Sequence, residues 1–467
     1  MSLHDDIFTG RASRVEPNIS LGRRGVVTVV GLGKTGLSCV RYLRRAGREV
    51  RVMDSRSDPP GLAALGEEFP EVSVTLGAFD ASKLGEADQI VLSPGVALAT
   101  PALADAIRAR VPICGDIEIF AEAAGRTPVV AITGSNGKST VTAMVADMLA
   151  ADGRAVKAGG NIGTPALELL EGPAADIYVL ELSSFQLETT ASLHPQAAAL
   201  LNVSADHMDR YPDVEAYAAA KQRIFRGHGT MVLNRDDPRV AAMAAPGRRV
   251  VLYTLSAPLP GQWGLRRTGG ELWLCQGETR IVRADALKVA GLHNAANALA
   301  AMALAAAVGV SHDAMARALE AFRALPHRCE LVAEAAGVRW YDDSKATNVG
   351  ATIASIRGLA HLGPIVLIAG GDGKGADFAQ LRDAVRDHVR LVIFIGRDGP
   401  RLAEAVADVA ETLPARGVAD AVRVARAHAH AGDTVLLAPA CASFDMYRDY
   451  VERGEAFVAE VRAGAGA

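Results

Sequence analysis

The segment "TGSNGKST" groups residue types that hold a phosphate, directly after the apolar run "VVAI". Gly134 and Gly137 leave backbone N–H groups free to point at phosphate oxygens, and Lys138 opens an expected helix whose positive end faces the same place. Lys138 would reach the β- and γ-phosphates of a nucleotide, while Ser139 or Thr140 offers a hydroxyl to Mg²⁺. The segment therefore predicts a nucleotide site.

The spacing of this loop departs from the common phosphate-binding pattern, which would place a glycine where the chain has Ile132. The alternative interpretation is a helix cap that is rich in small polar residues. A cap has no need of Gly-Lys-Ser-Thr after a buried strand, because one side-chain oxygen is enough to cap a helix. We therefore favour a shortened phosphate loop.

A second glycine loop, "GLGKTG", follows the apolar run "VVTVV" near the N-terminus. Gly31, Gly33 and Gly36 have the G-x-G-x-x-G spacing, and Asp54 ends the next apolar run. Glycines let the backbone approach a pyrophosphate at a helix N-terminus, and the acid takes a ribose. Alone, this fingerprint favours a nicotinamide dehydrogenase, but a nucleotide-sugar diphosphate needs the same cradle. A purely structural tight turn is the third alternative.

Three further residues have chemistry suited to a metal or a phosphate. Glu181 ends the apolar run "IYVLE", His207 lies between two aspartates in "ADHMDR", and Lys221 lies on the amphipathic segment "VEAYAAAKQRIF". A carboxylate beside a phosphate loop can ligate Mg²⁺. Each residue also has an ordinary interpretation, because strand-end glutamates, acid-flanked histidines and helix lysines are common on protein surfaces.

Short β-branched runs alternate with Ala/Leu-rich stretches along most of the chain, which is typical of βαβ units and parallel sheets. At 467 residues the chain has room for roughly three domains. We predict an α/β protein with a Rossmann-like N-terminal domain over 1–117, in which 1–24 are an uncertain tail, a central P-loop ATPase-like domain with a mostly parallel sheet over 118–324, and a Rossmann-like C-terminal domain over 325–467.

The predicted strands form three series, one for each domain. They cover residues 26–30, 49–53 and 89–93, then 129–133, 177–182, 197–203 and 230–234, and finally 364–370, 390–396 and 433–438. Residues 271–284 alternate around a glycine-containing turn, which predicts an antiparallel hairpin. The Ala-rich segment 295–307 predicts a close-packed helix.

Composition narrows the function classes. The 49 Lys+Arg and 53 Asp+Glu give a net charge of −4, which argues against a broad nucleic-acid or membrane surface. The 5 cysteines have no paired metal or redox spacing, which favours free thiols in a reducing compartment. The N-terminus lacks the apolar segment of a signal peptide, and no run approaches the roughly 18 apolar residues of a membrane span. We expect a cytoplasmic monomer.

The nucleotide loop "AITGSNGKST" resembles that of the Mur ligase family, the cytoplasmic ATP-dependent amide ligases that build the peptide stem of peptidoglycan. The resemblance extends over "GGNIG", "LELSSFQLE", "NVSADHMDRY", "AAKQRIF", "LPHRCE", "DDSKATN" and "GGDGKGADF". It covers nearly the whole chain after residue 25, and together these motifs are very specific.

The C-terminal motifs "DDSKATN" and "PACASFDMYRDYVERG" resemble the D-glutamate-adding branch of the family. The L-alanine-adding branch would show "DDYGHHP" and the diamino-acid-adding branch "DNPR". The resemblance implies that D-glutamate is joined to UDP-N-acetylmuramoyl-L-alanine through an acyl phosphate, with release of ADP and phosphate. The alternatives are a sibling ligase, an NAD- or nucleotide-sugar-dependent oxidoreductase and, third, a non-catalytic binding module.

The resemblance also implies site residues from all three predicted domains. For ATP they are Gly134, Ser135, Asn136, Gly137, Lys138, Ser139, Thr140, Asn297, Arg328, Asp343 and Lys345. For the UDP-sugar they are Gly31, Gly33, Thr35, Gly36, Asp54, Ser55, Arg56, Ser93, Gly95 and Asn161. For D-glutamate they are Thr347, Lys374, Ser443, Phe444 and Tyr450, the last in place of an expected phenylalanine.

Two Mg²⁺ ions are implied in the same way. Ser139 and Glu181 would share one ion, and His207 with Lys221 would serve the second. An ammonium cannot bind a cation, so the resemblance implies that CO₂ carbamylates Lys221. Lys138, His207 and Lys221 are the implied catalytic residues. Because these contacts come from three domains, we expect a site at their junction and a hinge closure on substrate binding.

Overall fold

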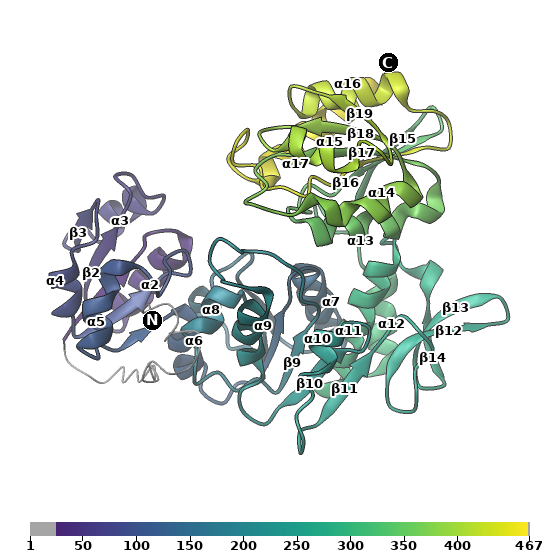
Figure 1. Ribbon diagram of the computed structural model, residues 1–467. Helices are drawn as coiled ribbons and strands as arrows, with labels where there is room; N and C mark the ends of the chain where they lie inside the picture. Colours follow the sequence, from purple (N-terminus) through teal and green to yellow (C-terminus); the bar gives the residue numbers. More distant parts are fainter. Residues whose placement is uncertain (1–24, 466–467) are drawn as a thin grey trace.

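The structure is a computed structural model that describes residues 25–465, so the predicted tail 1–24 lies outside the described residues. Three sheets with flanking helices follow one another along the chain (Figure 1), which confirms the predicted α/β class. Residue 117 lies within a helix and residue 324 lies between a helix and a strand. The domain boundaries at these residues stay predictions.

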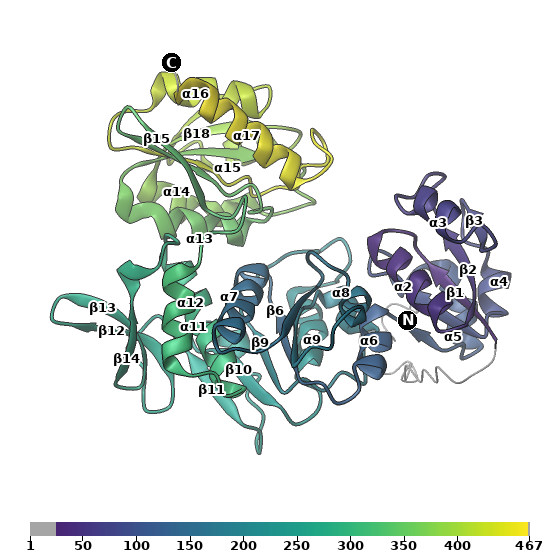
Figure 2. The ribbon, with the colours of Figure 1, turned by 180° about the vertical axis from the view of Figure 1, so that it is seen from behind.

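The N-terminal sheet is wholly parallel, with the strand order β3-β2-β1-β4-β5. The order in which the chain adds strands reverses between β1 and β4, since β2 and β3 lie on one side of β1 and β4 and β5 on the other. Such sheets bind ligands in the crevice outside the carboxyl ends of the strands at this point. The strands are β1 (Val26–Val30), β2 (Glu49–Asp54), β3 (Ser73–Leu76), β4 (Gln89–Leu92) and β5 (Ile113–Cys114). The helices are α2 (Lys34–Arg45), α3 (Leu62–Glu68), α4 (Ala81–Gly85) and α5 (Ala104–Arg108). The next helix, α6 (Asp116–Ala124), packs mainly against residues 166–170 and 184–188 of the central domain (Figures 1 and 2).

The central sheet has the order β14-β13-β12-β11-β10-β9-β6-β8-β7 and is parallel from β12 to β7. The predicted hairpin is present as antiparallel β13 and β14. The strands are β6 (Val129–Thr133), β7 (Val156–Gly160), β8 (Ile177–Glu181), β9 (Ala197–Leu200), β10 (Thr230–Asn234), β11 (Val250–Tyr253), β12 (Trp263–Thr268), β13 (Glu271–Gln276) and β14 (Thr279–Arg283). The helices are α7 (Lys138–Ala151), α8 (Ser184–Glu188), α9 (Val214–Gln222), α10 (Pro238–Ala241), α11 (Leu292–Ala307) and α12 (His312–Ala321).

The C-terminal sheet has the order β15-β16-β20-β17-β18-β19, and only the β15–β16 pair is antiparallel. Its strands are β15 (Glu330–Ala335), β16 (Val338–Asp342), β17 (Ile365–Gly370), β18 (Val389–Ile395), β19 (Glu411–Pro414) and β20 (Thr434–Leu437). Its helices are α13 (Val349–Leu359), α14 (Arg382–His388), α15 (Gly399–Val406), α16 (Val418–His428) and α17 (Tyr450–Ala465).

The central domain lies between the other two, which do not overlap in either view (Figures 1 and 2). Apolar side chains of the N-terminal and central domains form one continuous buried cluster, which includes Val29, Phe120 and Leu180. The C-terminal sheet has separate clusters on its two faces. None of the described helices combines the length and the apolar character that crossing a membrane requires.

Candidate active site

The loop that follows β6 is the shortened glycine loop, and its backbone requires glycine at two positions. Gly134 and Gly137 have φ values of 158° and 84°, where side chains are strongly disfavoured. A Cβ on Gly137 would lie 2.4 Å from Oδ1 of Asn297. Lys138 opens α7, and its ammonium donates to the carbonyls of Gly134 and Ser135 at 2.8 and 3.0 Å. The loop therefore curls around the ammonium group of Lys138.

A hydroxyl and a carboxylate meet beside this loop. Ser139 Oγ donates to Glu181 Oε2 at 2.5 Å, and Asn161 Nδ2 donates to the other carboxylate oxygen at 2.8 Å. Glu181 ends β8 and is only 2% exposed. Arg328 reaches across from the C-terminal domain and donates to Ser139 Oγ at 2.6 Å. The oxygens of Ser139 and Glu181 form a donor set that fits Mg²⁺.

Lys221 and His207 lie on the same cavity as this pair. The Lys221 ammonium is buried, donates to the Gly134 carbonyl at 3.0 Å and lies 4.4 Å from the ring centre of Tyr217. Burial holds the pKa of Lys221 well below its usual value, and burial also lowers the pKa of His207. His207 has a left-handed backbone with φ 57°. Such strained residues concentrate at functional sites.

A neighbouring cavity between the central and C-terminal domains holds most of the other predicted ATP residues. Burial raises the pKa of the Asp343 carboxyl there to about 6 and lowers the pKa of Lys345 to about 8. Asn297 donates to Asn294, three residues earlier on the same helix, at 3.3 Å. The predicted residues that line this cavity are Asn136, Gly137, Thr140, Asn297, Arg328, Asp343 and Lys345.

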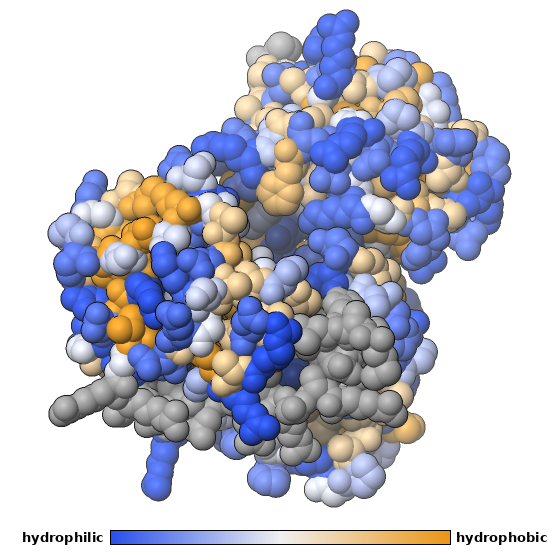
Figure 3. Space-filling view, turned by 60° about the vertical axis from the view of Figure 1, so that its left-hand side comes forward, coloured by the Kyte–Doolittle hydropathy of each residue, from blue (hydrophilic) through white to orange (hydrophobic). Residues whose placement is uncertain are grey.

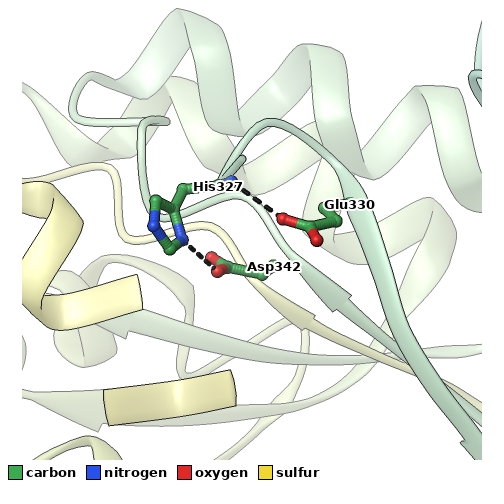
Figure 4. A group of neighbouring side chains, drawn as sticks. All are labelled: His327, Glu330 and Asp342. Carbon is green, nitrogen blue, oxygen red and sulfur yellow. Dashed lines mark hydrogen bonds and ion pairs between the residues drawn. The ribbon is translucent and has the colours of Figure 1, made fainter. Parts of the chain in front are cut away.

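The turn that carries Arg328 is fixed by its neighbours (Figure 4). His327 Nδ1 lies 2.6 Å from Asp342 Oδ2, and this carboxylate raises the pKa of His327. The backbone N–H of His327 donates to Glu330 at 3.1 Å. The three side chains could group around a metal ion, but their hydrogen bonds already use the nearest ligand atoms. We interpret the trio as the support that holds Arg328 toward Ser139.

The predicted D-glutamate residues enter the first cavity from the C-terminal side. Thr347, Lys374, Ser443, Phe444 and Tyr450 all line it together with Lys138 and Glu181. The Lys345 ammonium lies 4.0 Å from the ring centre of Tyr450, and that of Lys374 lies 5.6 Å from the ring centre of Phe444. Figure 3 shows the surface hollowed between the domains, with hydrophilic side chains inside.

A third cavity lies outside the carboxyl ends of β1, β2 and β4. The predicted UDP-sugar residues that line it are Gly31, Gly33, Thr35, Asp54, Ser55, Arg56, Ser93, Gly95 and Asn161. The Asp54 carboxylate accepts hydrogen bonds from the Leu32 N–H at 2.6 Å and from the Arg56 guanidinium at 2.6 and 2.9 Å. Arg56 lowers the pKa of Asp54 to about 2. A ribose would therefore share this acid with Arg56.

Two predicted residues, Gly36 and Gly134, line none of these three cavities. A Cβ on Gly36 would lie 1.9 Å from the Gly31 carbonyl, so this glycine permits close packing of α2 on the loop. Gly134 contributes its carbonyl to Lys138 and Lys221.

The cavity residues that escaped the sequence interpretation include Lys34, Tyr217 and Asn348. Lys34 stands inside "GLGKTG", and a cation in a phosphate loop is a signal that could have found it. Asn348 donates to Asp206 at 3.0 Å and to Asn136 at 3.2 Å across the domain junction. Local sequence patterns do not predict contacts of this kind. Whether this junction closes on substrates stays a prediction.

Family models match most of the chain. Residues 25–115 match "Mur ligase MurD-like, N-terminal domain", residues 132–305 match "Mur ligase middle domain", and residues 327–441 match "Mur ligase, glutamate ligase domain". Each match contains one of the three sheets, apart from strands at the edges of the matched ranges. The three matches occur in chain order.

Curated relatives and a solved structure agree with these matches. The UDP-N-acetylmuramoylalanine–D-glutamate ligase of Nitrosococcus oceani is 54% identical over 93% of this chain and 96% of its own. The ligase of the same name from Methylococcus capsulatus is 49% identical over 99% and 100%. The UDP-N-acetylmuramate-alanine ligase MurC of Thermotoga maritima has a TM-score of 0.61 at 19% identity, over 94% of this chain and 100% of that one. This chain belongs to the Mur ligase family.

Proposed function

We propose that the chain is the ATP-dependent ligase that joins D-glutamate to UDP-N-acetylmuramoyl-L-alanine in peptidoglycan precursor synthesis. Relatives with about 50% sequence identity over nearly the whole chain are named for this activity. The reaction forms an amide bond and converts ATP to ADP and phosphate. A carboxylate is a poor electrophile, so the substrate carboxylate is first phosphorylated and the amine of D-glutamate then attacks the acyl phosphate.

The position of Asn161 carries the proposal. This residue lines both the N-terminal cavity and the cavity beside the glycine loop. A nucleotide sugar bound in the N-terminal cavity can therefore place its far end in the cavity beside the glycine loop, next to Lys138 and Ser139. The cavity beside the glycine loop also holds Lys374 and Ser443 from the C-terminal domain. One cavity thus accepts the acid, the phosphate to be transferred and the amine.

The residues that line this cavity have distinct roles in the proposed reaction. ATP with Mg²⁺, when bound, supplies the phosphoryl group and neutralises part of its charge. Lys138 and Arg328 place cationic donors where negative charge develops, and Ser139 and Glu181 are the residues that would hold one Mg²⁺. Lys374 suits the anionic side chain of D-glutamate.

Lys221 is proposed to carry a carbamate that, with His207, would hold a second Mg²⁺. Carbamylation requires a neutral amine, and the buried position of Lys221 favours that form by lowering its pKa. The carbamate would place an anionic oxygen beside the glycine loop. His207 lies on the same cavity, and its lowered pKa favours the neutral imidazole that a metal requires.

We place the reaction in the cytoplasm. All 5 cysteines of the sequence are free and buried in the structure, which fits a reducing compartment.

The test is phosphate release with ATP, Mg²⁺ and UDP-N-acetylmuramoyl-L-alanine, with candidate amino acids added singly. We expect release with D-glutamate and not with L-glutamate, L-alanine or a diamino acid. Release with another amino acid would make the chain a sibling ligase. No release with any amino acid, together with a change in NADH absorbance in a parallel assay, would favour the oxidoreductase alternative.

A further inference from the structure

Lys34 is a cation inside the glycine loop of the N-terminal domain. It opens α2, directly after Gly33, and its exposed side chain lines the cavity outside β1 and β4. Its ammonium donates to the carbonyl of Gly163 at 2.6 Å. Gly163 belongs to the central domain and follows Asn161 by two residues. Lys34 therefore connects the two domains at the mouth of the cavity.

The partner of Lys34 leaves it free to bind more. A lysine ammonium has three donors, and one of them reaches Gly163. Among the described residues that line this cavity, the basic side chains are Lys34 and Arg56. Arg56 uses its guanidinium on both oxygens of Asp54, so its charge is already balanced. Lys34 faces a neutral carbonyl, and its charge is available to an anion.

The position of Lys34 matches the part of a nucleotide sugar that needs a cation. Backbone N–H groups at Gly33 and at the start of a 12-residue helix, α2, favour a phosphate at this end of the cavity. A charge-assisted contact to phosphate is stronger than one to a neutral carbonyl. A phosphate oxygen beside Gly33 can thus take a second ammonium hydrogen without breaking the bond to Gly163.

We propose that Lys34 binds the diphosphate of the nucleotide-sugar substrate and, through Gly163, holds the loop of Asn161 against it. The inference rests on the proposed function, because it takes the UDP group as the ligand. The loop matters because Asn161 donates at 2.8 Å to Glu181, which accepts the hydroxyl of Ser139. Lys34 is in this sense a binding residue that also positions the loop next to the reacting groups.

The experiment compares the wild type with Lys34→Gln and Lys34→Arg, by titration calorimetry with UDP and by competition with uridine. We expect Lys34→Gln to weaken UDP binding about tenfold and leave uridine binding unchanged, since uridine lacks the phosphates. Lys34→Arg keeps the charge and should lose less than threefold. The matched control is Lys83→Gln, which removes an exposed lysine of the same domain away from the cavity. Steady-state kinetics of Lys34→Gln should show a raised KM for the nucleotide sugar, from the lost phosphate contact, and a smaller fall in kcat, from the lost contact with Gly163 that positions the loop of Asn161.

The outcomes separate the two hypotheses. UDP affinity of Lys34→Gln within twofold of the wild type would overturn the role of Lys34 and leave the proposed function standing. An equal loss of UDP and uridine affinity would also overturn it, because the effect would then be structural. A wild type that binds neither UDP nor the nucleotide sugar would overturn the proposed function itself. Thermal melting of each variant shows whether it is folded, which the exposure of Lys34 leads us to expect.

Discussion

Ser139 and Glu181 are joined by a hydrogen bond of 2.5 Å from the serine hydroxyl to a carboxylate oxygen at the end of β8. The two residues lie 42 positions apart in the chain. They meet because β6 and β8 are neighbouring parallel strands, so the loop after one and the last residue of the other share an edge of the sheet. This pair is our candidate for holding one Mg²⁺.

Replacement of Glu181 by glutamine tests that assignment. Glu181→Gln keeps the shape but removes the charge, so we expect kcat to fall at least about 100-fold, or roughly 2.7 kcal/mol in the barrier. We also expect the Mg²⁺ concentration for half-maximal rate to rise. The control is Glu278→Gln in the exposed turn between β13 and β14. An unchanged Mg²⁺ dependence in the Glu181 variant would remove this residue from the metal site.

Lys221 offers a test by chemical rescue. Lys221→Ala removes the proposed carbamate, so we expect the variant to lose activity and a short-chain carboxylate such as acetate to restore part of it. The buried space left by the side chain is beside the Gly134 carbonyl, where the added carboxylate would bind. Lys288→Ala, an exposed lysine variant of the central domain, should be active and insensitive to acetate. Full activity of Lys221→Ala would contradict the carbamate.

Lys374 should act on D-glutamate and not on ATP. It is exposed in a glycine-rich loop and lines the cavity with Ser443 and Phe444. Lys374→Met removes a charge-assisted hydrogen bond worth about 1.5–3 kcal/mol. We expect the KM for D-glutamate to rise at least about tenfold, with the KM for ATP unchanged within twofold. Arg386→Met, on the exposed face of α14, serves as the matched control. A rise in both KM values would point to a general distortion of the domain.

The sequence predicted the parts of the fold that depend on local patterns. Strands β1, β6 and β17 are mostly apolar runs, which are buried at every position except Val26, and the glycine loops that follow β1 and β6 are recognised from their spacing alone. The predicted ranges missed β3, β5, β7, β11, β12, β15, β16 and β19. Of these, β3, β7 and β19 are short or rich in glycine and lie at sheet edges, where they have a neighbouring strand on one side only.

Contacts between domains were beyond the reach of local patterns. Arg328 reaches Ser139 across 189 positions, and Lys34 reaches Gly163 across 129. Such pairs are set by how folded domains pack, which periodicity does not encode. At Asp54 the sequence prediction also missed a contact between residues close together in the chain. The type of Asp54 and its place at the end of β2 predicted a ribose contact, but Arg56, two residues on, holds the carboxylate in the structure.

Asp116 gives the protein a pH-dependent stability that a single variant can reveal. It lies buried at the start of α6 and accepts a hydrogen bond from Gln186 at 2.9 Å. Burial raises its pKa from 3.8 to about 6. The folded state therefore binds this proton more tightly than the unfolded chain. Stability from the protonated carboxyl is present below pH 3.8 and is lost as the pH rises toward 6.

The variant Asp116→Asn cannot ionise and should escape this loss. We expect the melting temperature of the variant, relative to wild type, to be higher at pH 7.5 than at pH 4.5, because the difference in unfolding free energy grows by about 2 kcal/mol between these pH values. The control Asp58→Asn, exposed in the loop after β2, should show the same relative melting temperature at both pH values. A decrease in the melting temperature of Asp116→Asn relative to wild type from pH 4.5 to pH 7.5 would contradict this prediction. It would mean that the folded protein stabilises the Asp116 carboxylate, because the Gln186 hydrogen bond outweighs burial.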